Sequence, residues 1–258
     1  MLQAIIFDFD GVIADTEMLH LHAFQEVLRE QGVELTAADY YARYLGLDDY
    51  DVLRSVARAC GLVLDDTRLG GMLDDKAGRY ERLIATTPVL YDGVEQRVRE
   101  WSREVPLAIA SGAFRSEIEA ILRRNDLLSC FAAIVTAQDV ARGKPAPDLY
   151  ITALAALNGA EARSVPAVDP HSPRRIDTGR RAPDAGHRPA HITPRAVVVI
   201  EDSRPGVEAA RAAGMRSVGV TTNYPAEQLD ADLVVPSVAV LDLPILERLV
   251  AASPSERR

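Results

Sequence analysis

The chain has 258 residues, of which 48% are hydrophobic and 26% charged, and its formal net charge is −9. This balance is typical of a globular protein, and the excess of acid argues against general binding of nucleic acid or anionic membranes. The N-terminus lacks the basic start of a signal peptide, and no apolar run approaches the ~20 residues of a membrane span. We therefore expect a soluble, cytoplasmic protein.

The basic residues are almost all arginines. Only Lys76 and Lys144 are lysines, and the other 27 basic side chains are arginines. Arginine and lysine carry the same charge but differ as hydrogen-bond donors, so a lysine kept against this bias is a candidate for a specific chemical role. The two cysteines, Cys60 and Cys130, are far apart and lack metal-ligand spacing. We expect both to be reduced and buried.

The first predicted strand, at 3–7, is followed by a long stretch with helical periodicity and no convincing strand. Apolar residues recur at helical spacing at Leu21, Phe24 and Leu28 and again from Val52 to Val56. We interpret residues 15–88 as a small all-helical domain inserted after the first strand. Residues 1–14 and 89–258 then form the main domain.

Beyond residue 88, short apolar runs rich in β-branched residues alternate with helical stretches. In chain order, a helix is predicted at 93–103, a strand at 107–110, a helix at 115–125, and strands at 132–135 and 196–200. A helix at 204–213, strands at 217–220 and 233–235 and a helix at 245–251 complete the series. Alternation of this kind predicts an α/β fold, a Rossmann-like three-layer sandwich whose parallel sheet has helices on both faces.

A basic, proline-rich segment at 158–195 interrupts this alternation. Its seven arginines and four acidic residues give a charge of +3, so the rest of the chain carries −12. With few large apolar residues it cannot bury enough surface to offset the entropy of ordering. We expect a disordered segment or a long surface loop, and a partner-binding arm is the alternative.

Polar residues follow most of the predicted strands, where an open parallel sheet binds its ligands. They are Asp8 and Asp10 after the first strand, Ser111 and Gly112 after the second, Lys144 beyond the third, and Glu201 and Asp202 after the fourth. A single strand-end aspartate is more often a turn former or a helix cap. A set of such residues at four element ends indicates a functional site.

The composition of this set points to phosphoryl transfer. Four carboxylates beside one lysine would repel one another unless a cation joined them, and rigid carboxylate oxygens suit Mg²⁺. A divalent ion, a lysine and backbone amides together can hold the oxygens of a phosphoryl group. One of the two carboxylates in DFDG could attack phosphorus, and the other could protonate the leaving oxygen.

Four stretches of the chain resemble, in order, the four motifs of the haloacid dehalogenase superfamily of phosphatases and phosphomutases. They are FDFDGVIADTE, IASGA, RGKPAPDLY and VVVIEDSRPGVEAARAAGM. The helical insertion is similar to the C1 cap of subfamily I, the branch of β-phosphoglucomutase and phosphoglycolate phosphatase. The resemblance covers nearly the whole chain except the basic segment.

The resemblance implies a role for each matching residue. Asp8 would be the nucleophile that becomes an aspartyl phosphate, and Asp10 the general acid and then base. Ser111 and the amide of Gly112 would hold phosphoryl oxygens, and Lys144 would neutralise Asp8 and the phosphate.

The implied cofactor is Mg²⁺, and its implied ligands are Asp8, the backbone carbonyl of Asp10, Asp202 and the adjacent Glu201. The implied partner is a small phosphate ester, bound by a monomer.

The cap is expected to choose the substrate. Thr16 and His20 match positions near the general acid of the mutases, although His20 could be a surface residue. The cap loop carries Leu45, Asp48 and Asp49 where a mutase presents basic residues to a second phosphate. We therefore predict a phosphatase acting on a small phosphorylated metabolite such as a sugar phosphate.

Other functions remain open. A sugar phosphomutase is the first alternative, and a noncatalytic phosphate-binding module is the second. Asp10 argues against a true dehalogenase, which has no leaving alcohol to protonate. A phosphonatase would need a cap lysine to form its imine. Lys76, the only lysine in the cap, lies late in that domain, which argues against this activity.

Overall fold

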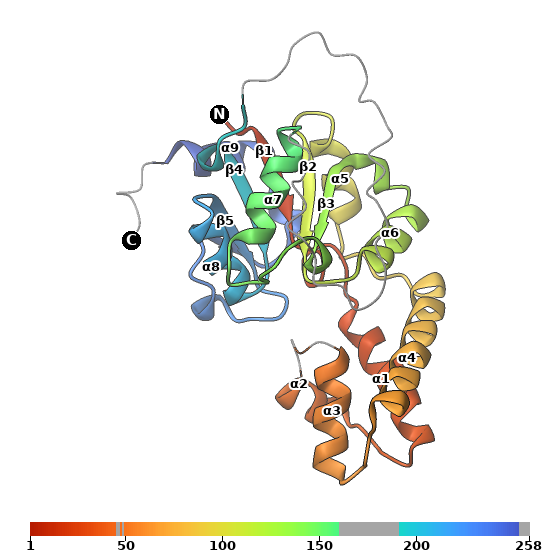
Figure 1. Cartoon of the computed structure of the whole chain (residues 1–258). Helices are drawn as coiled ribbons and strands as arrows, with labels where there is room; N and C mark the ends of the chain where they lie inside the picture. Colours follow the sequence, from red (N-terminus) through yellow and green to blue (C-terminus); the bar gives the residue numbers. More distant parts are fainter. Residues whose placement is uncertain (45–46, 48, 160–190, 253–258) are drawn as a thin grey trace. The chain divides into compact units, whose positions relative to one another are not determined.

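A computed structural model describes residues 1–44, 47, 49–159 and 191–252 (Figure 1). The chain forms two compact units. The core unit comprises residues 1–14 and 90–258, and the helical unit comprises residues 15–89. In the described part of the chain, no helix is both long enough and apolar enough to cross a membrane.

The core unit is built on a six-stranded parallel sheet, as the alternation of strands and helices predicted. Its strands are β1 (Ala4–Phe7), β2 (Leu107–Ser111), β3 (Phe131–Thr136), β4 (Val197–Glu201), β5 (Arg216–Val220) and β6 (Leu233–Val235). Their order in the sheet is β3-β2-β1-β4-β5-β6. The direction of the connections reverses between β1 and β4, and an open α/β sheet binds its ligand at such a point.

Helices cover both faces of the sheet, which confirms the predicted three-layer arrangement (Figure 1). They are α5 (Val94–Trp101), α6 (Arg115–Arg124), α7 (Asp148–Leu157), α8 (Arg204–Ala212) and α9 (Leu243–Ala251). Helices α7 and α8 pack on the face that carries Ala4 and Ile6. On the other face, Trp101 of α5 stacks on Phe7 at a centroid distance of 6.0 Å. Both residues are fully buried, so the central strand β1 is held from both sides.

The helical unit consists of α1 (Glu17–Glu30), α2 (Ala37–Arg43), α3 (Asp49–Cys60) and α4 (Asp66–Thr86). The predicted apolar positions Leu21, Phe24 and Leu28 all lie in its buried core. The side chains of Thr36 and Asp65 accept hydrogen bonds from backbone amides at the starts of α2 and α4. These caps satisfy donors that the first helical turn leaves free.

The prediction that both cysteines are buried is wrong. Cys60 is exposed rather than buried, because it is the last residue of α3 and lies beyond the buried positions of that helix. Cys130 is partly buried, and both cysteines are free thiols.

Residues 160–190 of the predicted insertion lie outside the described residues, as do Leu45 and Asp48. The end of the segment belongs to the core, where Ile192 is buried in the α7–α8 cluster.

Candidate active site

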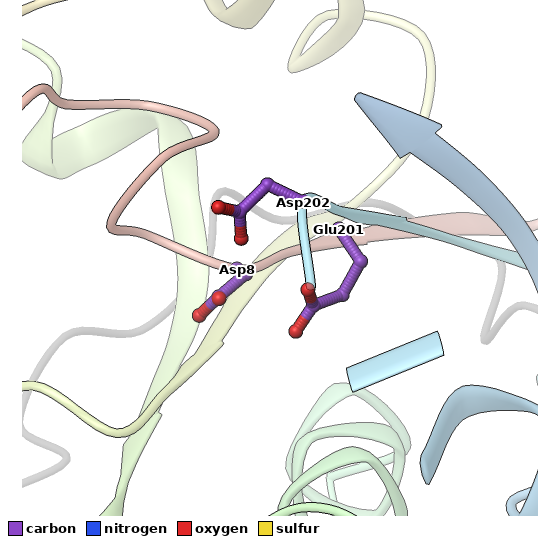
Figure 2. A group of neighbouring side chains, drawn as sticks. All are labelled: Asp8, Glu201 and Asp202. Atoms are coloured by element: carbon purple, nitrogen blue, oxygen red, sulfur yellow. The ribbon is translucent and has the colours of Figure 1, made fainter. Parts of the chain in front are cut away.

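Asp8 is the first residue after β1, at the reversal point of the sheet. In the β1–β4 pairing Phe7 lies beside Ile200, and the amide of Asp8 donates to the carbonyl of Ile200 over 2.9 Å. This register places Asp8 next to Glu201 and Asp202. Carboxylate oxygens of the three residues lie within 4.8 Å of one another, and all three residues are buried (Figure 2).

The chain turns sharply after Asp10, and Gly11 makes this turn possible. Its φ is +75°, and a Cβ at this position would lie 2.1 Å from an oxygen of Asp202. Only glycine combines this conformation with so close a neighbour. The amide of Gly11 donates to the carbonyl of Ala14, and its own carbonyl accepts from the Thr222 hydroxyl over 2.6 Å. The turn therefore fixes the Asp8–Asp10 segment against the loop that follows β5.

Lys144 brings a positive charge to the carboxylates. Its Nζ lies 2.9 Å from Oδ2 of Asp8 and also donates to Oε1 of Glu201. The side chain of Lys144 is only 13% exposed. Its burial disfavours the charge, but Asp8 and Glu201 outweigh that effect and raise the pKa of Lys144 well above its ordinary value. Lys144 is therefore an ammonium ion.

The charges of the three carboxylates are not balanced by one ammonium. Burial raises the pKa of Asp8 well above its usual range, and the charges of Glu201 and Asp202 add to this effect. Burial and Glu201 likewise raise the pKa of Asp202 to about 7. Glu201 differs: although burial opposes its charge, Lys144 and the Ser203 donors lower its pKa. The cluster thus has an excess of acidic groups that an added cation would stabilise as carboxylates.

The donor set fits a magnesium ion. Oδ1 of Asp8 is buried and has no hydrogen-bond partner, although buried polar atoms are nearly always satisfied. It lies in a cluster of hard oxygen ligands, the kind that Mg²⁺ prefers. A carboxylate oxygen that accepts no hydrogen bond and lies beside further carboxylates is available to bind a cation.

Ser111 and Gly112 follow β2, the neighbour of β1 on the other side. Ser111 is buried, and its hydroxyl accepts a hydrogen bond from the amide of Ala113 over 3.1 Å. The space around the Cα of Gly112 is open, since a Cβ there would meet no other atom within 4 Å. The turn thus leaves open space at Gly112, just after the carboxyl end of β2.

Thr16 and His20 lie in the helical unit. Thr16 is buried and precedes α1, where its carbonyl accepts from the amide of His20. Nδ1 of His20 is 2.7 Å from Nζ of Lys76, and its ring stacks on Tyr80. His20 is only 18% exposed, so it is not a surface residue. Burial and the Lys76 charge lower its pKa to about 3.

Lys76, the second lysine, is fully buried and already paired. Its Nζ donates to Oδ2 of Asp49 over 2.7 Å and lies about 5 Å from the ring centroids of Phe24 and Tyr80. Asp49 therefore neutralises the buried ammonium within the helical unit.

Three residues of the core site were not predicted from the sequence. Tyr150 donates a hydrogen bond to Glu201, Asn223 donates to Asp202 over 2.7 Å, and Thr222 binds the Gly11 turn. Ser203, which follows Asp202 at the end of its strand, also donates to Glu201. The signal for Thr222 and Asn223 was their place just after β5, where the other strands also carry polar residues. Tyr150 gave no such signal, because a tyrosine within a helix usually indicates packing.

The parallel sheet carries an aspartate loop after its first strand, and a lysine and an acidic pair meet this loop at the reversal point. This arrangement defines a hydrolase that acts by phosphoryl transfer. The comparisons with known proteins agree with this class. The chain belongs to the haloacid dehalogenase-like hydrolases, whose family model matches residues 5–172. A second model, described as HAD-hydrolase-like, matches residues 141–242.

Relatives of known name lie within this family. The chain is 28% identical to a phosphorylated carbohydrates phosphatase of Thermotoga maritima, with 84% of each protein covered. It is 28% identical to the β-phosphoglucomutase of Bacillus subtilis, over 95% of this chain and 94% of that protein. The crystal structure of a β-phosphoglucomutase from Clostridium difficile has the same fold, with a TM-score of 0.72, 21% identity and coverage of 97% and 98%.

Proposed function

We propose that this protein is a Mg²⁺-dependent phosphatase that hydrolyses a small phosphorylated metabolite, with a sugar phosphate as the first candidate. The observation that carries this proposal is the buried, unpartnered Oδ1 of Asp8 in a cluster of acids beside Lys144. Relatives that are named for phosphorylated carbohydrates and for a sugar phosphomutase support the substrate class.

Each site residue has a role in this proposal. A carboxylate oxygen of Asp8 attacks phosphorus, the bond from phosphorus to the ester oxygen breaks, and Asp10 gives its proton to the departing alcohol. A water molecule then loses a proton to Asp10 and attacks the aspartyl phosphate, which releases phosphate and restores Asp8. Ser111 and the Gly112 amide hold the phosphoryl oxygens, and Lys144 offsets their charge.

Asp8, Asp202 and the backbone carbonyl of Asp10 would hold the Mg²⁺, with Glu201 beside them. The ion, when bound, would neutralise the carboxylates and the charge of the phosphoryl oxygens. Both oxygens of Glu201 already accept hydrogen bonds within the protein, so Glu201 would have to give up a donor to become a ligand.

The helical unit favours hydrolysis over a mutase reaction. A mutase must hold a second phosphate through cationic groups. The buried ammonium of Lys76 is already neutralised by Asp49, so this pair offers no net positive charge to a second phosphate. Thr16 and His20 remain our candidates for contacts with the part of the substrate that leaves as an alcohol.

The proposal is tested by a panel of phosphometabolites assayed for release of free phosphate. We expect turnover with Mg²⁺ and none with EDTA, and Asp8→Asn should abolish it. Full activity of Asp8→Asn would rule out the aspartyl phosphate. Isomerised product that depends on a bisphosphate primer would show the mutase instead, and tight binding of esters without any turnover would show a binding module.

A further inference from the structure

Tyr150 is a buried residue of α7 whose hydroxyl reaches the candidate active site. It is fully buried, and its hydroxyl donates to Oε1 of Glu201 over 3.1 Å. The hydroxyl is the donor in this contact, because a phenol keeps its proton at neutral pH and a carboxylate can only accept. A buried hydroxyl needs a hydrogen-bond partner, and the partner of Tyr150 is a carboxylate of the candidate active site.

Glu201 is held at both oxygens. Oε1 accepts from Lys144 and Tyr150, and Oε2 accepts from the amide and the hydroxyl of Ser203 over 2.7 and 2.9 Å. The side chain also fills the space that Gly206 leaves, since a Cβ there would lie 1.6 Å from Oε1. Rotation of the carboxylate would break several charge-assisted hydrogen bonds at once. Glu201 is thus a fixed acceptor.

The fixed position of Glu201 matters because Lys144 has to stay beside Asp8 during the reaction. A lysine side chain has four flexible carbons and carries a compact charge, so its position depends on its partners. Lys144 has two of them, Asp8 and Glu201, and its Nζ also lies 5.5 Å from the centroid of the Tyr150 ring. When Asp8 reacts, Glu201 and the ring of Tyr150 are the contacts that can keep the ammonium in place.

We propose that Tyr150 is a positioning residue, which fixes Glu201 and through it holds the Lys144 ammonium beside Asp8. Its hydroxyl orients the carboxylate and its ring faces the ammonium. This role rests on the proposed phosphatase function, since Lys144 must stay next to the phosphoryl group while Asp8 changes its charge. A residue chosen only for packing would do equally well as phenylalanine.

The substitution Tyr150→Phe tests this role, because it keeps the ring and removes only the hydroxyl. We expect kcat to fall about 10-fold with KM within about two-fold of wild type, as for loss of one hydrogen bond to a charged group. Ser217→Ala is the matched control. Ser217 is also a buried residue of the core unit, and its hydroxyl donates to the carboxylate of Asp232. It lies near the start of β5, at the other end of the strand from the carboxyl edge that carries the site.

A second readout does not depend on activity. Because the chain has only two lysines, labelling lysine with ¹³C at Cε gives two NMR signals from the full-length protein. The signal that is missing in Lys144→Arg belongs to Lys144. In Tyr150→Phe we expect the Lys144 signal to shift or broaden while the Lys76 signal stays in place, and in Ser217→Ala neither should change.

The outcomes separate the proposals. A Lys144 signal identical to wild type in Tyr150→Phe would overturn the positioning role, and so would a changed signal with an unchanged kcat. If wild type releases phosphate from no ester, the phosphatase proposal fails, and the NMR comparison alone then decides whether Tyr150 holds Lys144.

Discussion

The contacts at position 144 depend on the residue being lysine rather than arginine. Its Nζ contacts both Asp8 and Glu201, and the lysine side chain is only 13% exposed. A guanidinium has the same charge but is larger and planar, and it cannot take both contacts in the same space. The bias of this chain toward arginine therefore makes a lysine here informative.

We predict that Lys144→Arg lowers kcat on the order of 10²-fold, the usual effect of losing one preorganised charged group. The measurement is phosphate release at saturating substrate. Arg142→Lys is the control, because its side chain lies in the same loop, is 71% exposed and forms its salt bridge with Asp148, away from the carboxylate cluster. We expect it to stay within about two-fold of wild type. Near-normal activity of Lys144→Arg would contradict a specific role for the ammonium.

His20 is the second single residue with a measurable consequence. Its pKa is lowered from 6.5 to about 3 in the folded state, so between these values the unfolded chain takes up a proton that the folded chain refuses. Stability contributed by neutral His20 is therefore complete above pH 6.5 and is lost as the pH falls, by about 1.4 kcal/mol per pH unit.

We predict that His20→Gln reduces this pH dependence. Glutamine keeps an oxygen that can accept from Lys76 but does not titrate. Urea unfolding of both proteins at pH 7 and pH 5 measures the difference, and wild type should lose more stability on acidification. Equal losses in the two proteins would mean that His20 takes up its proton in the folded state as easily as in the unfolded chain.

At the level of elements, the join between β4 and α8 is built around one glutamate and one glycine. Ser203 caps α8 by accepting from the amide of Gly206, and its hydroxyl also donates to Glu201. A Cβ at position 206 would lie 1.6 Å from a Glu201 oxygen, and Glu201 is fully buried. The start of this helix and the placement of the acid therefore depend on each other.

We predict that Gly206→Ala destabilises the protein by about 2 kcal/mol or more, the usual cost of overpacking a buried site. Gly71→Ala is the control within a helix, since a Cβ there meets nothing within 4 Å. That change should instead stabilise α4 by roughly 0.5–1 kcal/mol. Thermal unfolding midpoints of the two variants should move in opposite directions. A shared direction would show that the Glu201 contact does not set the cost at position 206.

The elements also show what a sequence can and cannot predict. The strands and the polar residues after them were predictable, because hydrophobic periodicity and parallel topology both bring strand ends to one edge. The contact between Tyr150 and Glu201 was not, because it joins residues 51 positions apart through the angle of a helix on the sheet. Packing likewise decides whether both carboxylate oxygens accept hydrogen bonds, as in Glu201, or one accepts none, as in Asp8.

At the scale of the whole molecule, the basic segment begins and ends within the core unit. The ends of that segment are joined by side chain and backbone: Asn158 donates to the carbonyl of Ile192 and accepts from its amide, over 3.1 and 2.8 Å. Ile192 is itself buried in the core. Asn158 and Ile192 therefore join the two ends of the segment within the core unit.

We predict that replacing residues 160–190 with a short glycine linker leaves folding and phosphate release unchanged. Because Asn158 and Ile192 already meet, the linker has little distance to span, and a shorter loop costs less closure entropy, by on the order of 1–2 kcal/mol. The unfolding midpoint should therefore stay the same or rise. Loss of soluble protein, or a midpoint several degrees lower, would show that the segment packs on the core. A variant that keeps its fold but loses activity would instead give the arginines of this segment a part in the function of the enzyme.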